Sequence, residues 1–191
     1  MSLTLGSIWT NTKNKRNKIK KIKKKKKAAV EKNTLIKNPV ERYDVKSFWG
    51  TPTWYLFHGI AANINTRFFD KNYVTILNFI KKVCSNLPCP YCRKHAEAYI
   101  NKIQPNQVNT REKLQKVLFD FHNIVNARIG KKILREEELI KYKTMDMVRC
   151  FQLFQSKFFK SYYGDRTFSY WVRKKFEDYF IKFSREIIKY F

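Results

Sequence analysis

Residues 87–92 read LPCPYC, and this stretch contains a C-x-x-C pair, Cys89 and Cys92, at the expected start of a helix. The spacing brings two sulfur atoms within reach of a disulfide bond. Where Cys92 begins a helix, unpaired backbone N–H groups and the positive end of the helix dipole favour the reactive thiolate over the thiol. Such a pair indicates either a redox-active dithiol or half of a zinc site, and other residues have to decide between the two.

The composition is that of one globular domain with tails. The chain has 191 residues, 43% of them hydrophobic, which is enough for one sizeable core. Its four cysteines are too few and too unevenly spaced for a secreted disulfide scaffold. No apolar run approaches the roughly 20 residues of a membrane span, and the N-terminus lacks the apolar core of a signal peptide. We therefore expect a soluble, cytoplasmic protein.

The formal net charge of +26 is concentrated near the N-terminus, where residues 13–27 contain 11 Lys or Arg and no acid. Blocks of like charge repel one another and stay solvated. We expect residues 1–44 to form a disordered basic arm. The arm either serves only as a solubilising tail, or acts in nuclear targeting, or makes weak contacts with nucleic acid or an anionic surface.

The remainder of the chain shows helical periodicity and no sustained alternation of period two, so the sequence predicts an all-α fold. Short loops between four short helices favour a bundle. We expect Thr51 to cap the first helix with Pro52 at its first position, and Asn109 to cap the fourth in a capping box with Glu112. The predicted helices are 52–64, 72–83, 92–103, 110–129, 135–142, 144–159 and, after a break at 164–165, a last helix to 191.

Two groups of polar and aromatic residues recur at helical spacing. Gly50, Trp54 and His58 are four residues apart, which leaves a spot without a side chain above an indole and an imidazole. His122, Asn123 and Asn126 lie beside an apolar stripe, just before the cations Arg128, Lys131 and Lys132. Taken singly, each group is compatible with an ordinary core or an exposed polar face. Together they would suit a heteroaromatic ligand that carries phosphates, because buried amides and imidazoles need hydrogen-bond partners.

In their order and separation the three motifs G-x-x-x-W-x-x-x-H, C-x-x-C and H-N-x-V-N-x-x-x-G-K resemble the Erv/ALR family of FAD-linked sulfhydryl oxidases. The versions encoded by large cytoplasmic DNA viruses are the most similar, and the resemblance covers about residues 47–143. It implies a four-helix FAD-binding bundle over residues 45–143. It also implies an enzyme that passes electrons from protein thiols through FAD to O₂, giving H₂O₂ and disulfide bonds.

The resemblance also implies roles for individual residues. Cys92 would face the flavin and Cys89 would exchange disulfides with the substrate. No metal is implied, and a homodimer is expected because family members commonly dimerise. The residues expected to line the cofactor site are Gly50, Trp54, His58, His95, His122, Asn123, Asn126, Arg128 and Lys131.

Two other functions compete with the oxidase. A glutaredoxin-like dithiol reductase shares the tetrapeptide CPYC but needs a β-strand before it, where residues 72–83 have helical periodicity. A basic binding module with a structural zinc would have to use Cys89, Cys92, His95 and His122, at an unusual spacing that leaves the asparagines unexplained.

Residues 144–191 form a predicted helical extension, and residues 151–191 contain 15 of the 31 aromatic residues. The apolar stripe of its last helix is broad and needs a cover. The chain's own bundle, a second copy of the chain or an anionic membrane surface would each serve. The stripe consists of Phe168, Trp171, Val172, Phe176, Tyr179, Phe180, Phe183, Ile187 and Tyr190.

Overall fold

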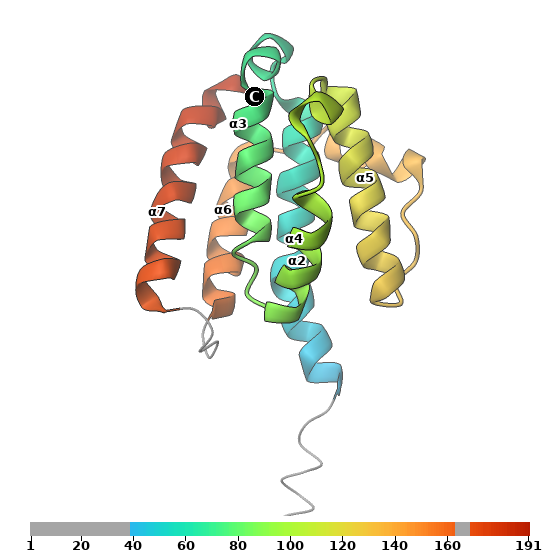
Figure 1. Ribbon diagram of the computed structural model, residues 1–191, viewed down its shortest axis with the longest axis vertical. Coiled ribbons are helices and arrows are strands. Elements are labelled where there is room, and N and C mark those ends of the chain that lie inside the picture. The colour runs from blue at the N-terminus through green and yellow to red at the C-terminus, as the bar shows by residue number, and fades with distance from the viewer. Residues whose placement is uncertain (1–38, 163–168) are drawn as a thin grey trace, which may run out of the picture. The chain divides into compact units, whose positions relative to one another are not determined.

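Figure 1 shows a computed structural model of the chain, which describes residues 39–162 and 169–191. All the secondary structure within these ranges is helical, so the predicted all-α class is confirmed. By its contacts the chain divides into two units, Met1–Asp44 and Val45–Phe191. Most of the predicted basic arm, the expected break at 164–165 and Phe168 lie outside the described residues.

Six α-helices and four short 3-10 helices follow one another along the described part of the chain. The α-helices are α2 (Pro39–Asn63), α3 (Thr66–Cys84), α4 (Pro90–Ile100), α5 (Arg111–Arg128), α6 (Met147–Phe158) and α7 (Tyr170–Ile187). The 3-10 helices are η1 (Pro105–Val108), η2 (Glu136–Tyr142), η3 (Phe159–Tyr162) and η4 (Ile188–Tyr190). None of the described helices is long and apolar enough to cross a bilayer.

The first helix was expected to begin at Pro52 with Thr51 as its cap, and this prediction is wrong. Pro52 lies inside α2, which already begins at Pro39. A proline in a helix removes one backbone N–H, and the preceding turn loses a hydrogen bond. Next to this gap the hydroxyl of Thr53 donates to the Trp49 carbonyl at 2.8 Å, which adds a bond across the same turn.

Two other helix starts also differ from the prediction. Helix α3 begins six residues before Asn72, because the side chain of Asn65 caps it by accepting from the Phe68 N–H. Helix α5 is capped by Thr110, whose hydroxyl accepts from the Lys113 N–H, so Asn109 is not the cap. The predicted stop of α5 at Gly130 is confirmed, since this glycine has a φ of +68° and follows the C-cap directly. The predicted helices 135–142 and 144–159 correspond to η2 and α6.

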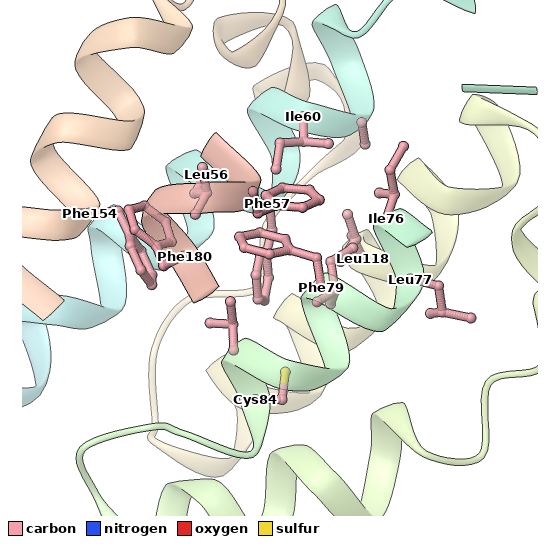
Figure 2. Close-up of a cluster of buried hydrophobic side chains, with 14 of the residues drawn as sticks. Leu56, Phe57, Ile60, Ile76, Leu77, Phe79, Cys84, Leu118, Phe154 and Phe180 are labelled. Carbon is pink, nitrogen blue, oxygen red and sulfur yellow. The ribbon is translucent and has the colours of Figure 1, made fainter. Parts of the chain in front are cut away.

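One hydrophobic core joins α2, α3, α5, α6 and α7 (Figure 2). It contains aliphatic side chains from α2 and α3 and a set of phenylalanines from α3, α6 and α7. The largest fully buried side chains include Phe57, Phe69, Phe79, Phe154, Phe158, Phe176 and Phe180. The core therefore extends continuously from the helices with the motifs into the C-terminal extension.

The apolar stripe of α7 is covered by the chain itself. Phe183 stacks on Phe79 of α3, with ring centroids 3.8 Å apart, and Phe180 stacks on Phe154 of α6 at 4.9 Å. Two members of the predicted stripe are exceptions, since 77% of Trp171 and 45% of Val172 are exposed. Both lie in the first turn of α7, before the helix is fully packed against α3 and α6.

Candidate active site

The two cysteines of the C-x-x-C pair are joined by a disulfide at the start of α4, with Cα atoms 5.2 Å apart. The sequence had indicated that Cys92 is the first residue of this helix. The helix instead begins at Pro90, so Cys92 is its third residue. Cys89 is the N-cap, and its Sγ accepts from the Cys92 N–H at 3.2 Å. Both sulfurs therefore lie in the first turn, where backbone N–H groups and the helix dipole stabilise negative charge.

The loop that enters the disulfide is fixed by hydrogen bonds to its carbonyl groups. Arg93 donates twice to the Leu87 carbonyl, from Nε at 3.1 Å and from Nη2 at 3.0 Å. Pro88 is buried, whereas 62% of Tyr91, between the two cysteines, is exposed. The motif is therefore accessible to a partner at Tyr91, while Arg93 holds the backbone of the preceding loop in place.

Four rings from three elements stack on one another beside α5, and we call them the imidazole stack: Trp54, His58, His122 and Tyr142. The Trp54 and His122 rings lie 3.9 Å apart and are nearly parallel, at 7°. His58 Nε2 and His122 Nδ1 are 3.0 Å apart and share a hydrogen bond. Tyr142 of η2 also stacks on His58, with ring centroids 4.4 Å apart. The predicted residues Trp54, His58 and His122 are therefore brought together.

The two histidines of the imidazole stack are held neutral. Burial, followed by the neighbouring His122 ring and the Lys141 ammonium group, lowers the pKa of His58 to about 3. Burial lowers the pKa of His122 to about 4, with Lys141 and Lys131 contributing. Two neutral imidazoles can share one proton as donor and acceptor, which agrees with the hydrogen bond between them.

The two asparagines of the H-N-x-V-N motif have different surroundings. The Asn123 amide donates to the Leu134 carbonyl at 3.0 Å and accepts from the Leu134 N–H at 2.8 Å. It therefore ties α5 to the segment that leads into η2. Asn126 is 7% exposed, and its backbone carbonyl accepts from the Lys131 N–H at 2.9 Å. A buried amide needs hydrogen-bond partners for its donors and its acceptor, and a polar ligand could supply them.

The other predicted ligand residues lie around these groups. Gly50 on α2 faces open space, because a Cβ built there meets no atom within 4 Å. The side chains of Arg128 and Lys131 are exposed at the end of α5. His95 Nδ1 lies 2.8 Å from the Tyr91 carbonyl, within the first turns of α4.

Tyr142 is a site residue that the sequence motifs did not reveal. It is 2% exposed, and its backbone carbonyl accepts from Asn63 Nδ2 at 2.7 Å. Burial raises the pKa of Tyr142 to about 12, with Tyr55 and Glu138 contributing. Tyr142 follows His122 by 20 residues and lies on a different helix, so no helical spacing in the sequence relates the two. A tyrosine within a largely charged segment was the one available signal.

Aromatic contacts connect the imidazole stack to the helix of the disulfide. Phe121 of α5 packs edge-on against Trp54, with centroids 5.3 Å apart, and also stacks on Tyr99 of α4 at 4.8 Å.

The two remaining cysteines are buried free thiols. Burial raises the pKa values of Cys84 and Cys150 above the usual value for a thiol, and Glu97 and Asp146 add to the respective shifts.

Comparison with known proteins gives consistent matches over these elements. The family described as Erv1 / Alr matches residues 51–147. The FAD-linked sulfhydryl oxidase of African swine fever virus, isolate Tick/Malawi/Lil 20-1/1983, is 38% identical over 94 residues, which are 47% of this chain and 75% of the relative. The mitochondrial FAD-linked sulfhydryl oxidase of Saccharomyces cerevisiae is 32% identical over 82 residues, 43% of each chain.

A relative from Invertebrate iridescent virus 3 is 36% identical over 84 residues, 44% of this chain. The match spans 57% of that relative. No solved structure matches the chain significantly. The matched residues contain the disulfide, all four rings of the imidazole stack and both asparagines, but they end at the start of α6.

Proposed function

Because the chain belongs to the Erv1 / Alr family, we propose that it is an FAD-linked sulfhydryl oxidase that makes disulfide bonds in thiol-containing protein substrates. The observation that carries this proposal is the Cys89–Cys92 disulfide at the start of α4, inside the family match. A disulfide in the first turn of a helix is suited to exchange, because the thiolate that leaves is stabilised there.

The residues present fit FAD. The Asn126 side chain is a buried polar group, and the space beside Gly50 is open. The rings of Trp54 and His122 are too close, at 3.9 Å, to admit another ring between them. A flat ring system would therefore lie against the outside of the imidazole stack, while Arg128 and Lys131 would balance the diphosphate. When bound, FAD supplies a two-electron acceptor that can pass electrons on to O₂.

The chain's own residues perform the thiol chemistry. A substrate thiolate attacks the Cys89 sulfur, the S–S bond breaks and Cys92 leaves as a thiolate. The second substrate thiol then displaces Cys89, so that the substrate gains a disulfide and the enzyme holds a dithiol. The N–H groups of the first turn stabilise each thiolate, and the Cys92 N–H, 3.2 Å from Cys89 Sγ, remains aimed at the entry sulfur.

The geometry is less compatible with the two rival functions. Residues 66–84, where a glutaredoxin-like reductase needs a strand, form helix α3. In the described ranges, no group of three or more His, Cys, Asp or Glu side chains is placed to hold a metal ion, as a zinc module would require. His122 is hydrogen-bonded to His58 and stacked on Trp54, which also argues against a ligand role beside Cys89 and Cys92.

Three further parts of the proposal concern partners and place. We propose O₂ as the electron acceptor, to be checked as H₂O₂ released per thiol pair oxidised. A homodimer is proposed for the family-matched helices, and sedimentation equilibrium would detect it. A cytoplasmic location is also proposed, to be checked by fractionation of cells that make the protein.

The central experiment replaces one cysteine at a time with serine and measures oxygen consumption with dithiothreitol. Cys92→Ser and Cys89→Ser each lose activity by at least about 100-fold, because no intramolecular disulfide can form. Flavin absorbance per protein stays close to that of the wild type, since no covalent bond to sulfur is needed to hold the cofactor. Cys84→Ser is the matched control and keeps activity. A colourless wild-type protein, or an active Cys92→Ser variant, contradicts the proposal.

A further inference from the structure

The C-terminal extension reaches the loop that leads into the Cys89–Cys92 disulfide. Tyr162, the last residue of η3, donates its hydroxyl hydrogen to the backbone carbonyl of Asn86. Both residues are buried, with 3% of Tyr162 and 6% of Asn86 exposed. Asn86 is thereby held on one side by the extension. On the other side its own amide donates to the Lys82 carbonyl at 2.8 Å, at the end of α3.

A second residue of the extension fastens Tyr162 itself. Arg173 of α7 donates from Nη1 to the Tyr162 carbonyl at 2.9 Å, and its guanidinium group lies 6.0 Å from the centre of the Tyr162 ring. The contact links α7 through η3 to residue 86, three positions before Cys89. Tyr162 and Arg173 both lie beyond residue 147, where the family match ends.

The next carbonyl of the same loop, that of Leu87, is held by helix α4 and not by the extension. Leu87 accepts two hydrogen bonds from Arg93 of α4, and the following Pro88 is buried and has no N–H group to offer. The path into Cys89 is therefore held at residue 86 by the extension and at residue 87 by the helix that carries Cys92. Cys89 has little freedom to move away from Cys92 while both attachments persist.

We propose that Tyr162 is a positioning residue for the redox dithiol, and that the extension thereby sets how strongly the pair favours the disulfide over two thiols. The proposal rests on the proposed function, because it assumes that Cys89–Cys92 is the redox-active pair. A loop pinned in the geometry of the disulfide raises the effective concentration of one thiol at the other. Freeing the loop gives the reduced form more conformations and favours it.

The test equilibrates the purified protein with glutathione and glutathione disulfide. Two glutathione thiols reduce the Cys89–Cys92 bond, giving two cysteine thiols and one glutathione disulfide. The ratio of forms, trapped with a thiol-blocking reagent, gives the equilibrium constant without involving flavin or oxygen. Tyr162→Phe keeps the ring contacts with Phe158 and Phe159 and removes one donor. We expect disulfide formation to weaken about three- to tenfold, the worth of one net hydrogen bond.

Tyr190→Phe is the matched control. It makes the same chemical change in the same extension, and the Tyr190 ring stacks on Phe68, at the opposite end of α3 from the loop. The inference predicts a shifted constant for Tyr162→Phe and an unshifted one for Tyr190→Phe. An unshifted Tyr162→Phe, or equal shifts in both variants, overturns it.

Arg173→Gln keeps the test decisive if Tyr162→Phe does not fold. It leaves the phenol in place and removes the bond to the Tyr162 carbonyl, so the constant should move in the same direction. A wild-type pair that does not exchange with glutathione at all would overturn the proposed function, and the inference with it. Normal exchange with unshifted constants would overturn the inference alone.

Discussion

His58 and His122 make the stability of the protein depend on pH. In the folded protein their pKa values are about 3 and about 4, below the ordinary value of 6.5. Below pH 6.5 the unfolded chain therefore binds more protons than the folded protein, and stability falls as the pH falls toward the folded pKa values. Between pH 6.5 and pH 5 each histidine costs about 2 kcal/mol of unfolding free energy.

Urea denaturation at pH 7 and pH 5 checks this prediction. Replacing His58 with Gln should make the difference between the two pH values smaller by about 2 kcal/mol. His95→Gln is the control, because His95 lies partly exposed and outside the imidazole stack. Equal pH dependence in the wild type and His58→Gln would contradict the assignment of a neutral, buried His58.

Two glycines of α2 offer a matched pair of substitutions. A Cβ at Gly50 meets nothing within 4 Å, whereas one at Gly59 comes within 2.7 Å of Met147 Sδ. Gly50→Ala should raise the unfolding free energy by about 0.5–1 kcal/mol, since alanine favours a helix. Gly59→Ala should gain less or lose stability. Thermal unfolding followed by circular dichroism gives both values.

The same pair also tests where the cofactor lies. If the open space beside Gly50 belongs to FAD, the added methyl group of Gly50→Ala should lower flavin content while stability rises. A more stable Gly50→Ala protein with full flavin content would place the cofactor elsewhere.

The sequence predicted part of this site and left the rest undetermined. Spacings of four on one helix brought Trp54 and His58 to one face, and the polar motif of α5 brought His122 to them. Tyr142 could not be predicted, because its ring arrives from a separate 3-10 helix whose path depends on the tertiary bonds of Asn63 and Asn123. Local periodicity says nothing about such bonds between distant segments.

At the scale of elements, Asn123 holds the segment between α5 and η2 in place. Its side-chain amide donates to the backbone carbonyl of Leu134 and accepts from the backbone N–H of the same residue. Asn123→Ala should lower the unfolding free energy by about 1–2 kcal/mol and speed hydrogen exchange at the Leu134 amide. Asn72→Ala, which removes a bond to the Phe68 carbonyl within α3, is the control for loss of an asparagine bond. Unchanged exchange at Leu134 would show that the segment is held by other contacts.

Helix cores were easier to predict than helix ends. The stripes of α3 and α5 follow from apolar spacing, and Gly130 ends α5 for a reason visible in the sequence. The starts depend on which of several polar residues turns its side chain back to the helix, as Asn65 and Thr110 do. Pro52 was misleading, because a proline is favourable at a first position and is also tolerated in an interior turn when neighbouring bonds compensate.

For the molecule as a whole, the extension acts as part of the core. Phe183 is 6% exposed and stacks on Phe79, whereas 77% of Trp171 on the same helix is exposed. Phe183→Ala should cost about 3–5 kcal/mol, and Trp171→Ala less than about 0.5 kcal/mol. Urea denaturation distinguishes the two. Similar small effects would mean that α7 contributes little to the stability of the core.

The sequence left three covers open for the apolar stripe of α7, and the fold uses the first of them. A stripe records that a face needs burial, but it carries no information on whether the covering surface belongs to the same chain or to another molecule. The stacking of Phe183 and Phe180 on α3 and α6 supplied that information.

The burial of Cys84 and Cys150 has a consequence for how thiols can be counted in this protein. A reagent that reacts with exposed thiols should report no thiols in the folded oxidised protein, two after mild reduction, and four in the reduced, unfolded chain, which contains four cysteines. A count of three after mild reduction would reveal that one buried thiol is reachable. Under the proposed function, substrate electrons would then enter only at Cys89 and Cys92, because the other two thiols are buried.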